Sequence, residues 1–164
     1  MCKPLYWTPE RISIGKNCYL WPNSRIQAID RYKNQTFKIS HIILGDNVSI
    51  QERCHIAATD ILIIGSNTTI ASNVMIQDVD HDYREINVNI LNQKLISNKV
   101  SIGENCFIGA GAKILSGSTL GRQCIVGANS VVRGVFPDCC VIAGIPAKIV
   151  KKYNKKLDIW EKVI

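Results

Sequence analysis

The stretch IGENCFIGAGAKILSGSTLGRQCIVGANSVVRGVFP, residues 102–137, repeats a pattern every six residues. The first residue of each hexad is aliphatic, the second is often Gly, and the fifth is small in most hexads. The aliphatic positions are Ile102, Ile108, Ile114, Leu120, Val126 and Val132. A short fixed period of this kind is typical of a solenoid, whose repeats bury their apolar residues against neighbouring repeats.

The same hexad pattern occurs in the preceding part of the chain. Its aliphatic positions there are Ile14, Leu20, Ile26, Leu44, Ile50, Ile56, Ile64, Ile70 and Ile76. A period of six fits neither an amphipathic helix nor a simple alternating strand. It predicts an all-β fold, a parallel β-helix in which three hexads form one coil and the strands of adjacent coils lie about 4.8 Å apart.

The interruptions of the repeat indicate how the rest of the single domain, residues 1–164, is organised. Residues 1–13 are expected to cap one end of a solenoid that extends over 14–146. Residues 31–43 loosen the repeat, and residues 82–99 break it completely, which indicates a loop that leaves the solenoid. In residues 147–164, apolar residues at spacings of three and four predict a short amphipathic helix that closes the other end.

Composition and charge narrow the class of protein. The chain has no run of about 18 apolar residues and no signal-peptide pattern at its start, so we expect a cytoplasmic protein with no integral membrane segment. The net charge is +7, but the late lysines form a local cluster rather than a stripe along the chain, which argues against nucleic acid as the partner. The cluster predicts either a solvated surface or a site for a phosphate-bearing ligand. Its members are Lys148, Lys151, Lys152, Lys155 and Lys156.

Four of the seven cysteines occupy the small fifth position of a hexad. They are Cys18, Cys54, Cys106 and Cys124. No CxxC pair occurs, which argues against a zinc knuckle. We therefore expect reduced cysteines that pack in the core as small apolar residues, without a catalytic or metal-binding role.

The segment IQDVDHDY, residues 76–83, places three aspartates around His81. In the hexad register, Asp80 takes the small corner position and His81 ends the coil. A calcium loop of the EF-hand type requires Gly at its sixth position and Glu at its twelfth, where this chain has Tyr83 and Asn89. The three histidines, at 41, 55 and 81, include no closely spaced pair that would suit zinc. We therefore predict no metal site.

The chain resembles the hexapeptide-repeat acyltransferases, the left-handed β-helix acetyltransferases, over roughly residues 14–152. The most specific segment is residues 100–150, which contains the family pattern G-x-P-A-K as GIPAK. Within the family it is similar to the sugar O-acetyltransferase branch, which includes galactoside and maltose O-acetyltransferases. The resemblance implies a left-handed solenoid, a homotrimer with active sites between subunits, and acetyl-CoA bound along each intersubunit cleft.

The resemblance also implies that His81 is the catalytic base. The family histidine lies 17 residues after the aliphatic residue of an Ile-Gly pair and immediately before a loop, and the count from Ile64-Gly65 reaches His81. Imidazole is partly unprotonated near neutral pH, so it can take the proton of an acceptor hydroxyl that attacks the thioester directly in a ternary complex. A carbonyl or a carboxylate is expected to orient the ring. The candidate carboxylates are those of Asp78, Asp80 and Asp82.

The same resemblance implies further contacts to acetyl-CoA and to the acceptor. The backbone N–H of Ala110 is expected to stabilise the oxyanion. The residues expected along acetyl-CoA are Phe107, Gly109, Ala110, Gly127, Ala128, Arg133, Lys148 and Lys151. Those expected at the acceptor are Gln51, Arg53, Asp78, Tyr83 and Arg84. Gln51 and Arg53 replace the Asn-type pattern of the galactoside enzymes, so a galactoside is not the expected acceptor.

The sequence therefore predicts an acetyl-CoA-dependent O-acetyltransferase that acts on a hydroxyl of a sugar or of a polysaccharide or glycan precursor. Two enzymatic alternatives stay open, a xenobiotic O-acetyltransferase that modifies an antibiotic and a nucleotide-sugar N-acetyltransferase. A third is a non-catalytic trimeric scaffold, which the presence of His81 argues against. A serine acetyltransferase is disfavoured because about 13 residues, rather than a long helical domain, precede the first hexad. The acceptor and the acyl group stay undetermined.

Overall fold

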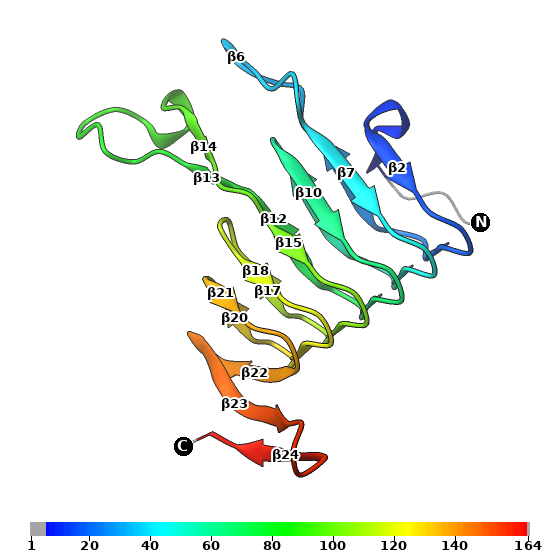
Figure 1. Ribbon diagram of the computed structural model, residues 1–164. Coiled ribbons are helices and arrows are strands. Elements are labelled where there is room, and N and C mark those ends of the chain that lie inside the picture. Colours follow the sequence, from blue (N-terminus) through cyan, green and yellow to red (C-terminus); the bar gives the residue numbers. More distant parts are fainter. Residues whose placement is uncertain (1–5, 164) are drawn as a thin grey trace.

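A stack of coils makes up the molecule (Figure 1), as seen in a computed structural model that describes residues 6–163. Most coils contribute one short strand to each of three sheets, and neighbouring coils pair in parallel. The inward aliphatic residue of each hexad drives this arrangement, because it has no other partner than its equivalents in adjacent coils. The predicted parallel β-helix is therefore confirmed.

The three sheets form three faces, each with its strands ordered along the chain apart from the last antiparallel additions. Face 1 comprises β1 (Tyr6–Trp7), β4 (Arg25–Ala28), β9 (His55–Ala58), β12 (Met75–Gln77), β17 (Lys113–Ile114) and β20 (Val131–Val132). Face 2 comprises β2 (Ile12–Ile14), β7 (His41–Leu44), β10 (Ile61–Ile64), β15 (Ser101–Ile102), β18 (Thr119–Leu120) and β21 (Val135–Phe136). Face 3 comprises β3 (Tyr19–Leu20), β8 (Ser49–Ile50), β11 (Thr69–Ile70), β16 (Phe107–Ile108), β19 (Ile125–Val126), β22 (Cys140–Gly144), β23 (Ala147–Asn154) and β24 (Ile159–Lys162).

The core is a set of aliphatic columns that run along the axis of the solenoid. On face 1, Ile26 pairs with Ile56, Ile56 with Ile76, and Ile76 with Ile114. All four side chains are fully buried. Burying one isoleucine side chain is worth about 1.5–3 kcal/mol, so the columns hold the register of every coil.

The four cysteines of the fifth hexad position lie at the corners, buried and free of disulfides. Each thiol donates a hydrogen bond to a backbone carbonyl of the following coil. The distances from Sγ to the carbonyl oxygen are 3.0 Å for Cys18 to Gly45, 3.2 Å for Cys54 to Ala71, 3.2 Å for Cys106 to Gly121 and 3.2 Å for Cys124 to Pro137. The prediction of reduced core cysteines is confirmed.

The prediction of a C-terminal helix is wrong. Residues 147–154 and 159–162 form β23 and β24, an antiparallel hairpin that extends face 3 from β22. Ile149 packs against the core, and the rings of Tyr153 and Trp160 meet across the hairpin at 5.5 Å. The open edge of β22 offers hydrogen bonds that a helix would leave unmade, and β-branched and aromatic residues suit a strand, so tertiary pairing overrides the helical spacing.

The predicted N-terminal cap lies partly outside the described residues. Among residues 6–13, β1 pairs with β4 and β2 pairs with β7, joined by the 3₁₀ turn η1 (Pro9–Arg11). These residues therefore continue faces 1 and 2 rather than crossing the end of the stack. Whether residues 1–5 add a cap stays a prediction.

Two segments leave the solenoid at the corner between faces 1 and 2, here called corner 1/2. The first is the hairpin, residues 31–36, formed by β5 (Arg31–Tyr32) and β6 (Gln35–Thr36). The second is the arm, residues 79–97, whose base is the antiparallel pair β13 (Val79–His81) and β14 (Leu95–Ser97) and whose tip includes the 3₁₀ turn η2 (Ile90–Asn92). Figure 1 shows both projecting on the same side.

The arm leaves the coil earlier than the break at residue 82 suggests. Asp78 is the last residue in the corner, and its side chain is fully buried. Asp80 and His81 already lie in β13, so the expectation that Asp80 fills the small corner position and that His81 ends the coil is wrong. The physical reason is that pairing between β13 and β14 starts at Val79, which draws these residues out of the hexad register.

Candidate active site

Asp78 anchors the root of the arm. Its Oδ1 accepts hydrogen bonds from the Thr59 N–H at 2.8 Å and the Thr59 hydroxyl at 2.9 Å, and its Oδ2 accepts from the Asp60 N–H at 2.8 Å. Its carbonyl accepts from the Ser116 hydroxyl at 3.1 Å. Burial raises the pKa of the carboxyl above its usual range. Because this side chain is fully buried and its oxygens are occupied, we assign Asp78 to the arm root and remove it from the expected acceptor contacts.

His81 lies at the end of β13, opposite Leu95 of β14. Its side chain is half-buried and borders an open cleft of about 440 Å³. Its Nδ1 is buried and makes no hydrogen bond within residues 6–163. The cleft is lined by Asp80, His81, Tyr83, Ile96, Asn98 and Arg133. An imidazole that faces a polar cleft can accept a proton from a group bound there.

The three aspartates expected to orient His81 have other partners in the described structure. Asp80 pairs with Arg133 at 3.0 Å across the cleft. Asp82 binds Arg84 through both carboxylate oxygens, and the hydrogen bonds from that guanidinium hold the pKa of Asp82 well below its usual range. Asp78 is buried at the arm root. The ring is therefore positioned by something other than these carboxylates.

The residues expected at the acceptor lie in two different places. Tyr83 is 72% exposed and lines the His81 cleft, with Arg84 next to it on the arm. Gln51 and Arg53 lie instead at the corner between faces 3 and 1, here called corner 3/1. There the Gln51 side-chain oxygen accepts from the Ser72 N–H at 3.2 Å, and Arg53 is exposed in a left-handed turn conformation.

The expected oxyanion donor also lies at corner 3/1. Ala110 is exposed, and its backbone N–H donates to no group among the described residues, whereas the equivalent N–H of Ser72 is bound by Gln51. Ala128 occupies the same turn position one coil further on and is also exposed. Gly109 must lack a side chain, because a Cβ there would meet the Val126 carbonyl oxygen and the Ala128 nitrogen at 2.7 Å. Ala110 and Ala128 are thus exposed at a corner where neighbouring coils pack closely, and their small side chains leave the backbone accessible.

The remaining residues expected along acetyl-CoA border face 3. Phe107 is 47% exposed on the outer surface, in one row with Ile125 and Val141, and Lys151 lies opposite Val141 on β23. Lys148 lies nearby, opposite Ala143. The row is apolar at one end and basic at the other. Arg133 is the exception, because the structure places it at corner 1/2 in the His81 cleft rather than beside these lysines.

The expected site residues of one chain therefore form two separate groups. In each coil, face 1 separates corner 3/1 from corner 1/2. Ala110 precedes β17 at the first corner, while Ser116, which supports the arm root, follows β17 at the second. His81 and the free N–H of Ala110 are consequently at opposite edges of face 1.

Sequence reasoning missed the residues of the hairpin. Tyr32 packs its ring against His81 with 5.6 Å between ring centroids, and Gln35 binds the backbone of Leu95. Ile96 and Asn98 of the cleft were also missed. The only signal was the loosened repeat over residues 31–43, which carries no information about the segment that the insertion contacts.

Comparisons with known proteins agree with this architecture. Residues 99–134 match the family model described as bacterial transferase hexapeptide (six repeats). The putative lipopolysaccharide biosynthesis O-acetyl transferase WbbJ of Escherichia coli (strain K12) is 41% identical over 128 residues, which cover 74% of this chain and 65% of that protein. The galactoside O-acetyltransferase of the same strain is 30% identical over 121 residues, 71% of this chain and 57% of that protein. This chain thus spans less than two thirds of either relative.

Solved structures show the same fold. A maltose O-acetyltransferase from Clostridium difficile 630 matches 89% of this chain and 72% of its own, with a TM-score of 0.72 and 27% identity. A galactoside acetyltransferase in complex with coenzyme A matches 90% of this chain and 68% of its own, with a TM-score of 0.70 and 24% identity. The fold is the expected left-handed parallel β-helix. Residues 99–134 thus carry the repeat of the hexapeptide transferases, and most of the chain has the fold found in these acetyltransferase structures.

Two further findings concern metal sites and membrane-spanning segments, which were both considered from the sequence. Within residues 6–163, no group of three or more histidine, cysteine, aspartate or glutamate side chains is arranged to hold a metal ion. Over the same residues, no helix has the length and apolar character needed to cross a bilayer.

Proposed function

We propose that this protein is an acetyl-CoA-dependent O-acetyltransferase that modifies a hydroxyl of a sugar or of a glycan precursor. His81 is the general base, and each active site lies between two subunits of a homotrimer. The observation that carries this proposal is the divided site. His81 faces an open cleft at one corner of the solenoid, and the unoccupied N–H of Ala110 lies at another, where a neighbouring subunit can meet it.

The outer surface of face 3 and corner 3/1 suit coenzyme A. Phe107, Ile125 and Val141 give an apolar row for the pantetheine arm and the adenine, and Lys148 and Lys151 give positive charge for the phosphates. The small side chains of Ala110 and Ala128 leave room for the thioester end to approach the backbone. The relatives support coenzyme A as the partner, because a matching structure is a complex with it.

The acetyl transfer needs two protein groups, the imidazole of His81 and the backbone N–H of Ala110. His81 takes the proton of the acceptor hydroxyl as its oxygen attacks the thioester carbonyl. The Ala110 N–H stabilises the negative charge that develops on the carbonyl oxygen. When the carbon–sulfur bond breaks, the imidazolium returns the proton to the leaving sulfur, which gives the acetyl ester and free coenzyme A. No group beyond the two substrates is consumed.

The cleft supports a carbohydrate hydroxyl as the acceptor. It combines the aromatic ring of Tyr83 with the polar side chains of Asn98, Asp80 and Arg133, and sugars are recognised by such a mixture of aromatic surface and hydrogen-bonding groups. The pairing of Asp80 with Arg133 fixes both side chains without a buried charge. The name of the 41% identical relative points to lipopolysaccharide precursors as the first acceptors to assay.

The first test replaces His81 with Gln, which keeps a polar side chain of similar size but cannot accept the proton. Coenzyme A release is measured with acetyl-CoA and a panel of sugars, nucleotide sugars and antibiotics. We expect His81→Gln to lower kcat about 10²–10⁴-fold. His41→Gln, on face 2 and hydrogen-bonded to Ser13, should retain full activity. Turnover of amine acceptors alone would identify an N-acetyltransferase, and absence of both transfer and slow thioester hydrolysis in the wild type would identify a scaffold.

The second test removes the oxyanion donor. Ala110 precedes Gly111, whose φ of +72° marks the third position of a tight turn, so proline is sterically compatible at position 110 and deletes only the N–H. We expect Ala110→Pro to lower kcat about 10²–10³-fold, while Ala110→Ser, which keeps the N–H, stays near the wild-type rate. Equal activity of the two variants would rule out this N–H as the donor.

A further inference from the structure

The arm that carries His81 has little support from the solenoid itself. The pairing of β13 with β14 continues only as far as the hydrogen bond from the Asp82 N–H to the Lys94 carbonyl at 2.8 Å, and several apolar side chains toward the tip are exposed. They are Tyr83, Ile86, Val88, Ile90 and Leu91. A segment with few buried contacts opens easily, yet a catalytic base must be held within a fraction of an ångström of its working position. The solenoid holds the base of the arm through the Asp80–Arg133 pair and the Thr59–Ser97 hydroxyl contact at 2.7 Å, and a second element that holds β14 and the imidazole would add to this support.

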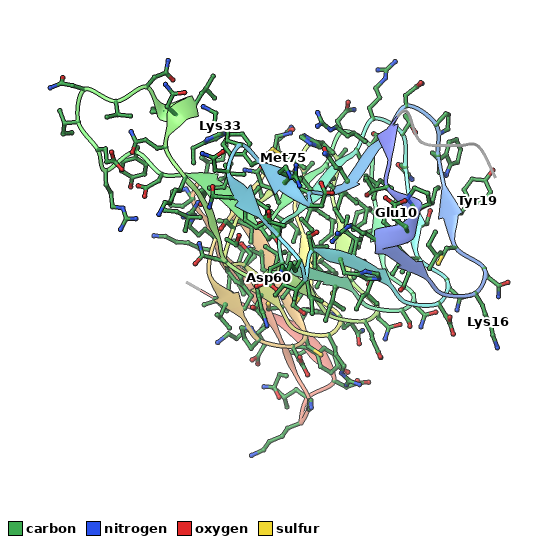
Figure 2. All side chains as sticks on the ribbon, turned by 90° about the horizontal axis from the view of Figure 1, so that it is seen from above. Glu10, Lys16, Tyr19, Lys33, Asp60 and Met75 are labelled. Atoms are coloured by element: carbon green, nitrogen blue, oxygen red, sulfur yellow. The ribbon has the colours of Figure 1, made fainter. Side chains whose placement is uncertain are left out.

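The hairpin of residues 31–36 makes that contact. The Tyr32 hydroxyl donates to the Leu91 carbonyl at 2.9 Å, and the Lys33 ammonium donates to the Asn92 side chain. Figure 2 shows Lys33 beside the arm, at the end of the molecule away from Tyr19. The hairpin therefore binds the arm on its η2 side as well as at its base.

Gln35 acts on the strand that is paired with His81. Its side-chain oxygen accepts from the Leu95 N–H at 2.6 Å, and its side-chain nitrogen donates to the Leu95 carbonyl at 3.1 Å. Leu95 is the residue opposite His81 in the β13–β14 ladder. Because both backbone groups of Leu95 point away from β13, the Gln35 amide completes the free edge of β14 as a neighbouring strand would.

Tyr32 acts on the imidazole itself. Its ring meets the His81 ring edge to face, at 5.6 Å and 73°, and its hydroxyl is tied to the arm by Leu91. The ring quadrupoles favour this edge-to-face arrangement, so the pair restricts the orientation of the imidazole. The buried Nδ1 of His81 has no hydrogen-bond partner in residues 6–163, so an aromatic contact takes the place of the expected carboxylate.

We infer that the hairpin is a support for the arm and that Tyr32 is a positioning residue that fixes the imidazole of His81. This inference rests on the proposed role of His81 as the base. It assigns to Tyr32 no contact with the substrates, so its loss should reduce kcat while leaving the KM for acetyl-CoA unchanged.

The test compares Tyr32→Leu, which removes the ring, with Tyr32→Phe, which keeps it. We expect kcat to fall about tenfold in Tyr32→Leu, because the imidazole loses the ring that fixes its position, and to stay within about twofold in Tyr32→Phe. Tyr19→Leu is the matched control, because Tyr19 forms a similar edge-to-face pair with Trp21 on face 3. It should leave kcat and the His81 signals unchanged.

A second readout is independent of activity. The chain has three histidines, so the ring signals of His41, His55 and His81 can be separated by NMR of histidine-labelled protein. Tyr32→Leu should shift only the His81 ring protons, because they lose the neighbouring ring current, and Tyr32→Phe should not. Unchanged His81 signals and full kcat in Tyr32→Leu would overturn the inference, as would a general loss of stability that moves all three histidines. Full activity of His81→Gln would instead overturn the proposed function.

Discussion

Asp78 shows how one residue can join the solenoid to its functional segment. Its carboxylate takes three hydrogen bonds from Thr59 and Asp60 of the preceding coil, and its carbonyl takes one from Ser116 of the following coil. A buried carboxylate is costly unless its oxygens are satisfied in this way. The arm can therefore leave the solenoid without an unpaired polar group at the point of departure.

Replacing Asp78 with Asn should destabilise the protein by about 1–3 kcal/mol, because an amide N–H would then face a backbone N–H in a buried site. Asp80→Asn is the matched control. It removes an exposed ion pair with Arg133, which is worth about 0–1 kcal/mol. Urea unfolding of both variants checks the prediction, and equal losses in the two would contradict it.

The Asp78 carboxyl should also contribute to the pH dependence of the free energy of unfolding. Burial raises its pKa in the folded state above the ordinary value of 3.8, so the folded chain holds this proton more tightly than the unfolded chain. Its contribution to stability is then fully present below that ordinary value and is lost as pH rises through the folded-state pKa. The free-energy gap between the wild type and Asp78→Asn should therefore shrink as pH rises above about 4.

Single residues were predictable from sequence where the repeat defines their surroundings. The repeat places Ile114 in the core and Cys106 in a buried corner, and both positions are as expected. The aspartates around His81 were not distinguishable, because their partners Thr59, Arg84 and Arg133 come from a different coil or from the arm's own turn. A spacing rule cannot choose among carboxylates once the chain has left the repeat.

At the scale of elements, the solenoid strands and the attached segments obey different rules. The strands follow from a local pattern, because each inward residue meets its own equivalent in the next coil. The hairpin and the arm contact each other about 60 residues apart in sequence, through side chains such as Tyr32 and Gln35. Such contacts leave no periodic trace, so the sequence predicted that the segments leave the solenoid but not that they meet.

The packing of the C-terminal hairpin, β23 and β24, against the core can be tested directly. In β23, Ile149 packs against the core and the adjacent Val150 is exposed. We expect Ile149→Asp to destabilise the protein by about 2–4 kcal/mol, because it places a charge against the apolar core, and Val150→Asp by under about 1 kcal/mol. Chemical denaturation measures both, and similar costs at the two positions would contradict the packing of Ile149 against the core.

At the scale of the whole molecule, the proposed site between subunits would make activity a property of the assembly. His81→Gln and Ala110→Pro damage different halves of the site, which the proposed trimer joins from neighbouring subunits. If sites lie between subunits, purified mixed trimers should recover about one third of wild-type activity, since one of the three interfaces in each mixed trimer combines two intact halves. Coexpression of the two variants with different tags, followed by tandem purification and assay, measures this recovery. Mixed trimers as inactive as either parent would place both groups in one subunit.

The hairpin and the arm start from the same corner two coils apart, one after β4 and the other after β12. At about 4.8 Å per coil, their roots are separated by roughly 10 Å along the axis, a gap that the side chains of Tyr32 and Gln35 span. Duplicating a coil beyond residue 100 would lengthen the solenoid and leave this gap intact. Duplicating the coil between residues 37 and 77 would move the two roots apart by half as much again. The number of coils after the arm can therefore change without affecting this contact, whereas the number of coils between the hairpin and the arm cannot.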